Sequence, residues 1–385
     1  MPSAKETLEE FIETDVSIKY IRLQWIDYSG VLRARFVPIA RCLQIASGSE
    51  NACMTQSSML VPISTAPRIF SPSDYHETWF LHPDWSSPRH CGFKAHHAAA
   101  MSFVDQKDAE TRFDKCPRKL MVRALEHLEQ EWGAQFLIGL RSIEEIINGL
   151  ERSSIQIHHF HAELNDQLEI ALAPEPALAA VDSLVLAQEA IRTICVRRGI
   201  KATMSPKPTL AGPSNGLYLH RSLSQPGRVL ADTFVAGILD HMGSLCAFGM
   251  ANYDSYGRSA SDCASAWIGF GFDNRDLPVR KISEWHWELR MMDGTANPYL
   301  FVGAVLLAAL DGLEKKTELV WKDCKFFPDM MDGEMRIEFG IDKRMPITLK
   351  EALDCLKMDT ALKTSIGEDL IQCDEQRRVR FLEYF

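Results

Sequence analysis

The stretch FDNRDLPVRKISEWHWELRMMDGTANPYL, residues 272–300, joins an alternating charged segment to the start of a helix. Polar and apolar side chains alternate through SEWHWELRMMD, so Glu288 and Arg290 lie on one face of a predicted strand. The ANPYL segment begins a predicted helix over residues 298–314, and Pro298 stands near its first turn, where proline is well tolerated. The stretch therefore predicts a strand that presents a carboxylate and an arginine together, followed directly by a helix.

Two other stretches carry side chains suited to chemistry. In HAELNDQLE, residues 161–169, Glu163 and Glu169 are six residues apart, so both carboxylates face one side unless the strand bulges midway. SPKPTLAGPSNGLYLHRSL, residues 205–223, contains a turn and a strand that reaches His220. The stretch over residues 272–300 adds two arginines before its predicted strand, Arg275 and Arg280. Carboxylates opposite several arginines suit metal–phosphate chemistry or the capture of an acidic substrate.

The N-terminal region predicts a β-hairpin. Residues 18–26 place three apolar side chains on one face, those of Ile21, Leu23 and Trp25. DYSG then supplies a turn, and residues 31–38 alternate again as far as Pro38. From there to residue 110 the sequence predicts mainly loops, because Pro, Ser and His recur.

The centre of the chain predicts strands and helices without a strict βαβ order. We expect a helix over 118–133, a strand over 139–147, a strand over 155–174 and a helix over 181–199. Asp182 or Ser183 is the expected cap of the last helix, and Arg141 lies within the first strand. No Rossmann or P-loop glycine motif follows a strand. The chain is therefore predicted to be an α+β protein.

Composition excludes several classes of partner. The 385 residues carry a formal net charge of −10, which argues against nucleic acid or an anionic membrane as the main partner. The longest apolar run, residues 298–313, is too short to span a bilayer, and the acidic N-terminus does not read as a secretory signal. The ten cysteines are scattered without a C-x-x-C pair, so free thiols are expected. These features predict a cytoplasmic location.

A histidine cluster, IHHFH, raises the possibility of zinc. On a regular strand His159 and His161 share one face and His158 points to the other, and no second pair of ligands follows. Zinc is therefore not the favoured interpretation of this cluster.

Together these stretches resemble the glutamine synthetase family. The resemblance rests on the E-x(5–7)-E strand, the x-P-K-P segment before a G-x-x-x-H loop, and the E-x-R-x-x-D-x-x-A-N-P-Y-L signature, in the order and spacing of the family. The N-terminal hairpin resembles the small β-grasp domain of the family, so the resemblance covers nearly the whole chain. It implies a β-grasp-like domain over residues 1–110 and a glutamine synthetase-like catalytic domain over residues 111–385, with a curved antiparallel sheet flanked by helices. It also implies a homo-oligomeric ring in which one small domain completes the neighbouring site.

The family transfers a phosphoryl group from ATP to a carboxylate, which ammonia or an amine then attacks. Mg²⁺ or Mn²⁺ ions, held mostly by glutamates, bridge the phosphates. By position, the resemblance implies metal ligation by Glu163, Glu169 and Glu288, contacts with the substrate carboxylate by Arg258 and Arg290, and phosphate contacts by Arg275 and Arg280. His220 matches the second histidine of the G-x-H-x-H loop of the family.

Several family positions are changed in this chain. Arg141 and Ile143 replace the two metal-binding glutamates of the G-x-E-x-E strand, and Tyr218 replaces the first histidine of G-x-H-x-H. Two further positions are changed in looser alignments, Ala264 for a loop glutamate and Pro213 for a substrate-binding asparagine. Half of the six metal ligands of the family are therefore absent.

An arginine at a metal-ligand position repels a divalent cation at short range. We therefore expect Arg141 to replace the metal and to pair with Glu163 or Glu288. The alternative is a strand shifted by two residues, which would bring Glu145 into a ligand position.

Three functional hypotheses follow. The leading one is an enzyme on this scaffold that uses neither ATP nor metal and acts on an acidic small molecule. Its predicted substrate-binding residues are Arg258, Arg290, Arg275, Arg280 and Arg141, and its predicted acid–base residues are Glu163, Glu169, His220 and Tyr218. The alternatives are an ATP- and Mg-dependent carboxylate–amine ligase with Glu163, Glu169 and Glu288 as ligands, and a ring-forming pseudoenzyme. A neighbouring subunit could supply a missing group, such as Asp27 or His76.

Overall fold

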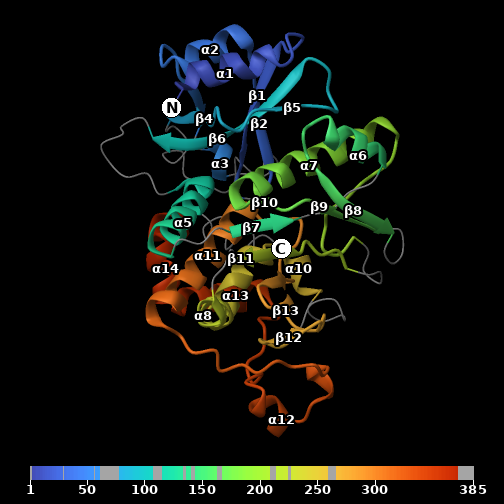
Figure 1. Ribbon diagram of the computed structural model, residues 1–385, viewed down its shortest axis with the longest axis vertical. Helices are drawn as coiled ribbons and strands as arrows, with labels where there is room; N and C mark the ends of the chain where they lie inside the picture. Colours follow the sequence, from blue (N-terminus) through green and yellow to red (C-terminus); the bar gives the residue numbers. More distant parts are fainter. Residues whose placement is uncertain are drawn as a thin grey trace.

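The computed structural model combines helices with mainly antiparallel sheets, in an upper and a lower part in the view of Figure 1. It describes residues 2–28, 30–55, 57–60, 78–106, 115–132, 136–139, 144–162, 167–208, 214–223, 227–258 and 266–371. The predicted α+β class is confirmed. The predicted domain boundary near residue 110 lies outside the described residues and stays a prediction, as does the β-grasp assignment of the first part.

The first sheet runs in the order β2-β1-β6-β4-β3, and β5 also pairs with β6. Its strands are β1 (Tyr20–Ile26), β2 (Leu32–Pro38), β3 (Ala52–Thr55), β4 (Thr78–Pro83), β5 (Arg89–His90) and β6 (His97–Gln106). β1 and β2 pair antiparallel, which confirms the predicted hairpin. Ile21, Leu23 and Trp25 are at most 6% exposed, as their shared face requires. Helices α1 (Ala4–Glu13) and α2 (Ile39–Ala46) cap this sheet at the top of Figure 1.

The loop-rich prediction for the region up to residue 110 is wrong, because β3 to β6 lie within it. The sequence of β6, HAAAMSFVDQ, has alanines near its start, and alanine has a weak preference for strands. β6 pairs in parallel with β1 and antiparallel with β4, so neighbouring strands determine its conformation.

Two long helices lie in the middle of the chain. α5 (Pro117–Trp132) confirms the predicted helix, whereas α7 (Ala177–Arg197) begins earlier than predicted. Asp182 and Ser183 are therefore buried inside α7 and are not its cap. Asp182 accepts a hydrogen bond from Nε of Arg118 at 3.1 Å, so a partner on another helix satisfies its carboxylate.

The second sheet carries the residues that the sequence singled out. It runs in the order β10-β7-β11-β14-β13-β12 and is antiparallel except between β12 and β13. Its strands are β7 (Phe136–Gly139), β10 (Glu175–Pro176), β11 (Leu219–Leu223), β12 (Phe270–Phe272), β13 (Val279–Ser283) and β14 (His286–Leu289). Leu219, Trp287 and Leu289 lie on one face and are at most 2% exposed. Helices α8 (Gly227–Asp240), α9 (Met242–Gly249) and α11 (Pro298–Lys315) belong to the same core.

Two predicted strands are corrected. The strand over 139–147 ends at Gly139, and helix α6 (Glu144–Glu151) follows, so the shifted strand that would make Glu145 a ligand is wrong. Ile147 and Leu150 are three residues apart, a spacing that suits a helix. The strand over 155–174 is a hairpin of β8 (Ile157–Ala162) and β9 (Leu168–Leu172), with an antiparallel pairing. Glu169 therefore lies on the second strand of a hairpin and not on one continuous strand, and Glu163 lies outside the described residues.

The β1–β2 turn packs against the start of α11 within the same chain. The Nδ2 atom of Asn297 donates to the carbonyl of Asp27 at 2.9 Å, and a Cβ on Gly30 would lie 2.6 Å from the carbonyl oxygen of Thr295. The Asp27 side chain is fully buried and accepts from Nε of Arg33 at 2.8 Å. Asp27 is thus used inside its own subunit, and His76 lies outside the described residues.

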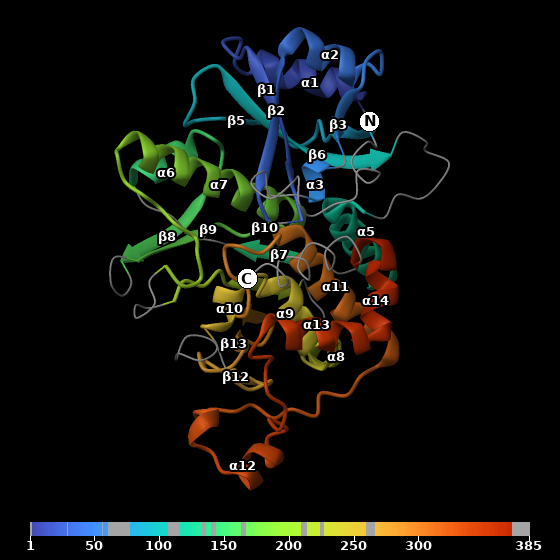
Figure 2. The same ribbon diagram turned by 180° about the vertical axis from the view of Figure 1, so that it is seen from behind.

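The remaining elements are α3 (Ser57–Leu60), α10 (Tyr253–Tyr256), the short η2 helix (Pro328–Met330), α12 (Gly333–Glu338), α13 (Leu349–Met358) and α14 (Thr360–Ile366). The first of these, α3, contacts β3 of the first sheet. Figure 2 shows α12 projecting from the lower end of the molecule. Among the described residues, no helix has both the length and the apolar character needed to cross a membrane.

Candidate active site

A buried glutamate between two arginines forms the centre of the candidate site. Glu288 on β14 lies opposite His220 on β11 and Arg280 on β13, because both neighbouring strands pair with β14. One carboxylate oxygen of Glu288 accepts from Nη1 of Arg280 at 2.9 Å, and the other accepts from Nη1 of Arg290. Glu288 is 2% exposed. Burial opposes its ionisation, but the charges of Arg290, His220 and Arg280 outweigh burial and lower the pKa of Glu288.

Tyr218 contacts Arg290 through both its hydroxyl and its ring. Nη2 of Arg290 donates to the Tyr218 hydroxyl at 3.3 Å, and the guanidinium carbon lies 4.2 Å from the centre of the Tyr218 ring. A Cβ on Gly216 would come within 2.5 Å of that ring, so this position requires glycine. Arg290 therefore has partners at both Nη atoms and on one face of its guanidinium group.

Arg258 supports the chain behind Arg290. Its Nη1 and Nη2 atoms donate to the carbonyls of Met292 and Arg290 at 3.0 and 3.1 Å, and the residue is 1% exposed. The structure places it beside the site, bonded to the backbone. A contact of Arg258 with a substrate stays a prediction.

Two histidines lie next to the carboxylate. Nδ1 of His220 is 3.2 Å from Nε2 of His286, which precedes Glu288 by two residues on the same strand face. Burial lowers the pKa of His286, with Glu288 acting against burial and Arg221 and Arg280 acting with it. The sequence reasoning missed His286. Its two-residue spacing from Glu288 was the available signal.

The other predicted site residues are not brought into this cluster by any described contact. Arg275 is exposed in the loop after β12, and Glu169 lies on β9 opposite His161. Arg141 and Glu163 are outside the described residues, together with Pro213, Ala264 and Ile143. In the β8–β9 hairpin, Nδ1 of His158 is 3.0 Å from Nδ1 of His159 because the strand bulges there. The expectation that these two side chains point to opposite faces is therefore wrong.

The described donor set does not fit a divalent metal. Each oxygen of Glu288 accepts from a guanidinium group that would repel a nearby dication, whereas Mg²⁺ needs several oxygen ligands around it. Within the described ranges, no three His, Cys, Asp or Glu side chains form a group that could hold a metal ion.

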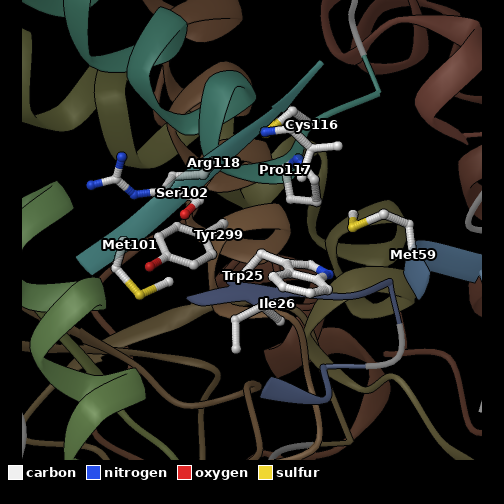
Figure 3. A pocket seen from close by; sticks show the side chains of 10 residues that line it. Trp25, Ile26, Met59, Met101, Ser102, Cys116, Pro117, Arg118 and Tyr299 are labelled. Carbon is white, nitrogen blue, oxygen red and sulfur yellow. The ribbon is translucent and has the colours of Figure 1, made fainter. Parts of the chain in front are cut away.

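A small cavity lies elsewhere, between the first sheet and α11. Figure 3 shows Trp25 and Met59 on one side of it and Tyr299 with the Arg118 side chain on the other. Its volume is about 10 Å³, close to the space of one water molecule. It therefore has no room for a metabolite.

Comparisons with known proteins agree on one family. The family model for the glutamine synthetase catalytic domain matches residues 139–374. Glutamine synthetase of Pyrococcus woesei is 32% identical over 408 residues, covering 92% of this chain and 88% of that protein. Protein FluG of Emericella nidulans is 28% identical over 422 residues, covering 96% of this chain but 47% of FluG, so the chain spans about half of that relative.

Solved structures show the same fold. A GmaS/ADP complex has a TM-score of 0.81 at 20% identity and covers 98% of this chain and 96% of its own. A structure described as a novel glutamine synthase homolog has a TM-score of 0.76 at 22% identity, with 95% and 94% covered. The α+β fold is thus glutamine synthetase-like, and the chain belongs to the glutamine synthetase family.

Proposed function

We propose that this chain is an enzyme of the glutamine synthetase family that acts on an acidic small molecule without ATP or a divalent metal. The observation that carries the proposal is the position of Glu288 between Arg280 and Arg290, each bonded to one carboxylate oxygen. The family resemblance assigns Glu288 to a metal site, and here each of its two oxygens is bonded to a guanidinium group.

Electrostatics supports this proposal. A divalent cation bound to Glu288 would have to displace one or both guanidinium groups, and these would then lie close to the ion. Arg290 has little freedom to withdraw, because Tyr218 contacts both its Nη2 atom and its face. Arg280 and Arg290 balance the carboxylate charge in the way that the metal does in the family.

The same face provides groups for binding and for moving a proton. Arg280 is 18% exposed at its side chain, and its Nη2 atom donates to the exposed Asp273 at 2.6 Å. An anionic group from solvent can therefore bind Arg280 by replacing Asp273, with the exposed Arg275 nearby in sequence. In a neutral pair of imidazoles, His220 and His286 share one N–H between Nδ1 and Nε2. The two remaining ring nitrogens are then one donor and one acceptor, so the pair can give one proton and take another.

Calorimetry with Mg·ATP and with Mn²⁺ alone tests the metal- and ATP-independent reading. We expect no heat of binding from either titration. A panel of carboxylic and phosphorylated acids is then screened for an increase in Tm, and Arg280→Ala should lose the increase that the best acid gives. Arg41→Ala is the matched control, because Arg41 is an exposed arginine paired with a glutamate in the first part of the chain. Micromolar binding of Mg·ATP refutes the proposal.

The second candidate is an ATP-dependent carboxylate–amine ligase. The 32% identity to a glutamine synthetase over 92% of the chain favours it, as does a 26% match to gamma-glutamylpolyamine synthetase GlnA3 of Streptomyces coelicolor. This function predicts Mg-dependent ATP hydrolysis that requires a carboxylic acid and an amine. A pseudoenzyme would bind neither ATP nor any acid of the panel.

The proposal includes assembly. Members of this family are typically oligomeric, and we extend this to a homo-oligomer with its sites at subunit interfaces. Because Asp27 is paired inside its own subunit, it is not the group that a neighbour would supply. Light scattering after size exclusion measures the mass, and a monomer at micromolar concentration contradicts this part of the proposal.

A further inference from the structure

His241, at the corner between α8 and α9, lies between two aspartates from other helices. Its Nδ1 atom is 2.7 Å from Oδ2 of Asp359, at the start of α14, and its Nε2 atom is 3.0 Å from Oδ2 of Asp311 in α11. The exposed fractions of the three side chains are 8% for His241, 15% for Asp311 and 12% for Asp359. Both ring nitrogens therefore face carboxylate oxygens in a largely buried setting.

Only the protonated ring can make both contacts as hydrogen bonds. An imidazolium donates from both nitrogens, whereas a neutral imidazole has one N–H and one lone pair. In the neutral ring, a lone pair would face one of the two carboxylates. Among the described residues, the other charges near His241 include Lys315, whose Nζ is 2.7 Å from the same oxygen of Asp311, and Asp240, which is next in sequence. On α13, burial and the nearby carboxylates, Asp359 among them, raise the pKa of the Cys355 thiol. The loss of one proton therefore leaves excess negative charge among four helices.

We propose that His241 is a proton-operated latch that docks the C-terminal helices α13 and α14 onto the helix layer of the second sheet, closed when the ring is protonated. α13 packs on α9, and α14 packs on α11, so these are the contacts that the latch reinforces. Arg221 of β11 lies over Phe234 of α8, so the same helices support the sheet that carries Glu288. The proposal is independent of the proposed activity.

The direction of the pH effect follows from the contacts. Burial lowers the pKa of His241, but the hydrogen bonds with Asp359 and Asp311 outweigh burial and raise it above its ordinary value. A raised folded pKa means that the stabilisation is complete below the unfolded value of about 6.5 and is lost as pH rises through the folded value. The latch therefore opens on the alkaline side.

Amide hydrogen exchange on the full chain measures the latch directly. We expect residues 349–366 to exchange about tenfold faster above the folded pKa of His241 than below it, after correction for the intrinsic rate. Residues of β1 and β2 should show no such step. In His241→Gln, residues 349–366 should exchange fast at every pH, because no imidazolium forms.

Two further variants distinguish a latch from a merely structural histidine. Asp359→Asn removes one charge but keeps a good helix cap, since Oδ1 of Asp359 accepts from the backbone N–H of Leu362 at 3.0 Å. It should move the step to lower pH. His127→Gln is the matched control, because Nε2 of His127 is also 3.0 Å from a carboxylate of α11, that of Glu314, but both side chains are more than 40% exposed.

The outcomes separate cleanly. A wild-type step that persists in His127→Gln, shifts in Asp359→Asn and vanishes in His241→Gln supports the latch. The absence of a step in the wild type, or a step that persists in His241→Gln, overturns it. If His241→Gln fails to fold, the position of the step in Asp359→Asn decides, and an unchanged position counts against the latch.

Discussion

The arginines on the two faces of the second sheet have different partners, a carboxylate on one face and aromatic rings on the other. On one face, Arg280 and Arg290 share the carboxylate of Glu288. On the other face, the Arg221 guanidinium lies 4.5 Å from the ring of Phe234 and 4.8 Å from that of Trp287. Its Nε, Nη1 and Nη2 atoms have no hydrogen-bond partner among the described residues. Burial lowers the pKa of Arg221 to about 9, the direction expected for a cation without a carboxylate.

This difference teaches that buried charge alone does not locate a site. His220 and Arg221 are consecutive on β11, yet one faces Glu288 and the other faces the apolar core. The first face gathers charges and titratable groups that complement one another, which is what binding and proton transfer require. The second face holds the buried Arg221, which aromatic rings stabilise only in part, and the half-buried Lys281, whose Nζ lies 5.7 Å from the centre of the Trp287 ring.

Removing the carboxylate should give the largest effect. Glu288→Gln leaves Arg280 and Arg290 facing a neutral amide in a buried position, so we expect a loss of about 3–5 kcal/mol in the free energy of unfolding. Urea denaturation measures it. The control is Glu338→Gln, because Glu338 is exposed and 3.5 Å from Lys322. Equal losses of stability in Glu288→Gln and Glu338→Gln would show that the pairing of Glu288 with Arg280 and Arg290 contributes no more than an exposed ion pair.

A gain in stability is expected on the face that carries Arg221 and Trp287. Arg221→Met keeps a long side chain between Phe234 and Trp287 and removes a buried cation without hydrogen bonds, so stability should rise by about 1–3 kcal/mol. Arg118→Met is the informative contrast, because Arg118 is equally buried but donates to Asp182 and Asp84. That variant should lose stability. If Arg221→Met is less stable than the wild type, the contacts of the guanidinium with the rings of Phe234 and Trp287 stabilise the protein by more than the burial of the charge destabilises it.

Acid should weaken the ion pairs of Glu288 with Arg280 and Arg290, and so lower the free energy of unfolding. The pKa of Glu288 is lowered in the folded protein, so its stabilising contribution is present above the unfolded value of 4.5 and is lost as pH falls through the folded value. The free energy of unfolding of the wild type should therefore fall more steeply below about pH 4.5 than that of Glu288→Gln. Parallel curves for the two proteins would contradict this assignment. The measurement is urea denaturation as a function of pH.

Sequence could predict the elements whose local pattern and tertiary environment agree. The β1–β2 hairpin, the start of α11 at Pro298, and the shared face of Glu288 and Arg290 all depend on spacing within a few residues. The strand over 139–147 failed because EEIINGLE has helical spacing next to a short strand. The spacing of apolar residues predicts such helices and strands, and their ends are uncertain where helical and strand spacing overlap in sequence.

Contacts between distant segments could not be predicted in the same way. Asp182 resembles a helix cap in sequence but is buried inside α7, where Arg118 and Tyr299 reach it. His286 escaped notice because its partner, His220, comes from a strand 66 residues away. Pairing across strands fixes these neighbours, and a single sequence does not give the register.

The hydroxyl of Tyr218 should have the smallest effect of the changes considered. Tyr218→Phe removes the acceptor of Nη2 of Arg290 at 3.3 Å but keeps the ring 4.2 Å from the guanidinium carbon. We expect a loss of about 0.5–1.5 kcal/mol in the free energy of unfolding, measured by urea denaturation. Tyr20→Phe, at an exposed tyrosine of the first sheet, is the matched control and should change little. Tyr218→Ala should lose more than Tyr218→Phe, since it also removes the ring. If the two Tyr218 variants are equally stable, the hydroxyl and not the ring holds Arg290, and the paired face depends on hydrogen bonds alone.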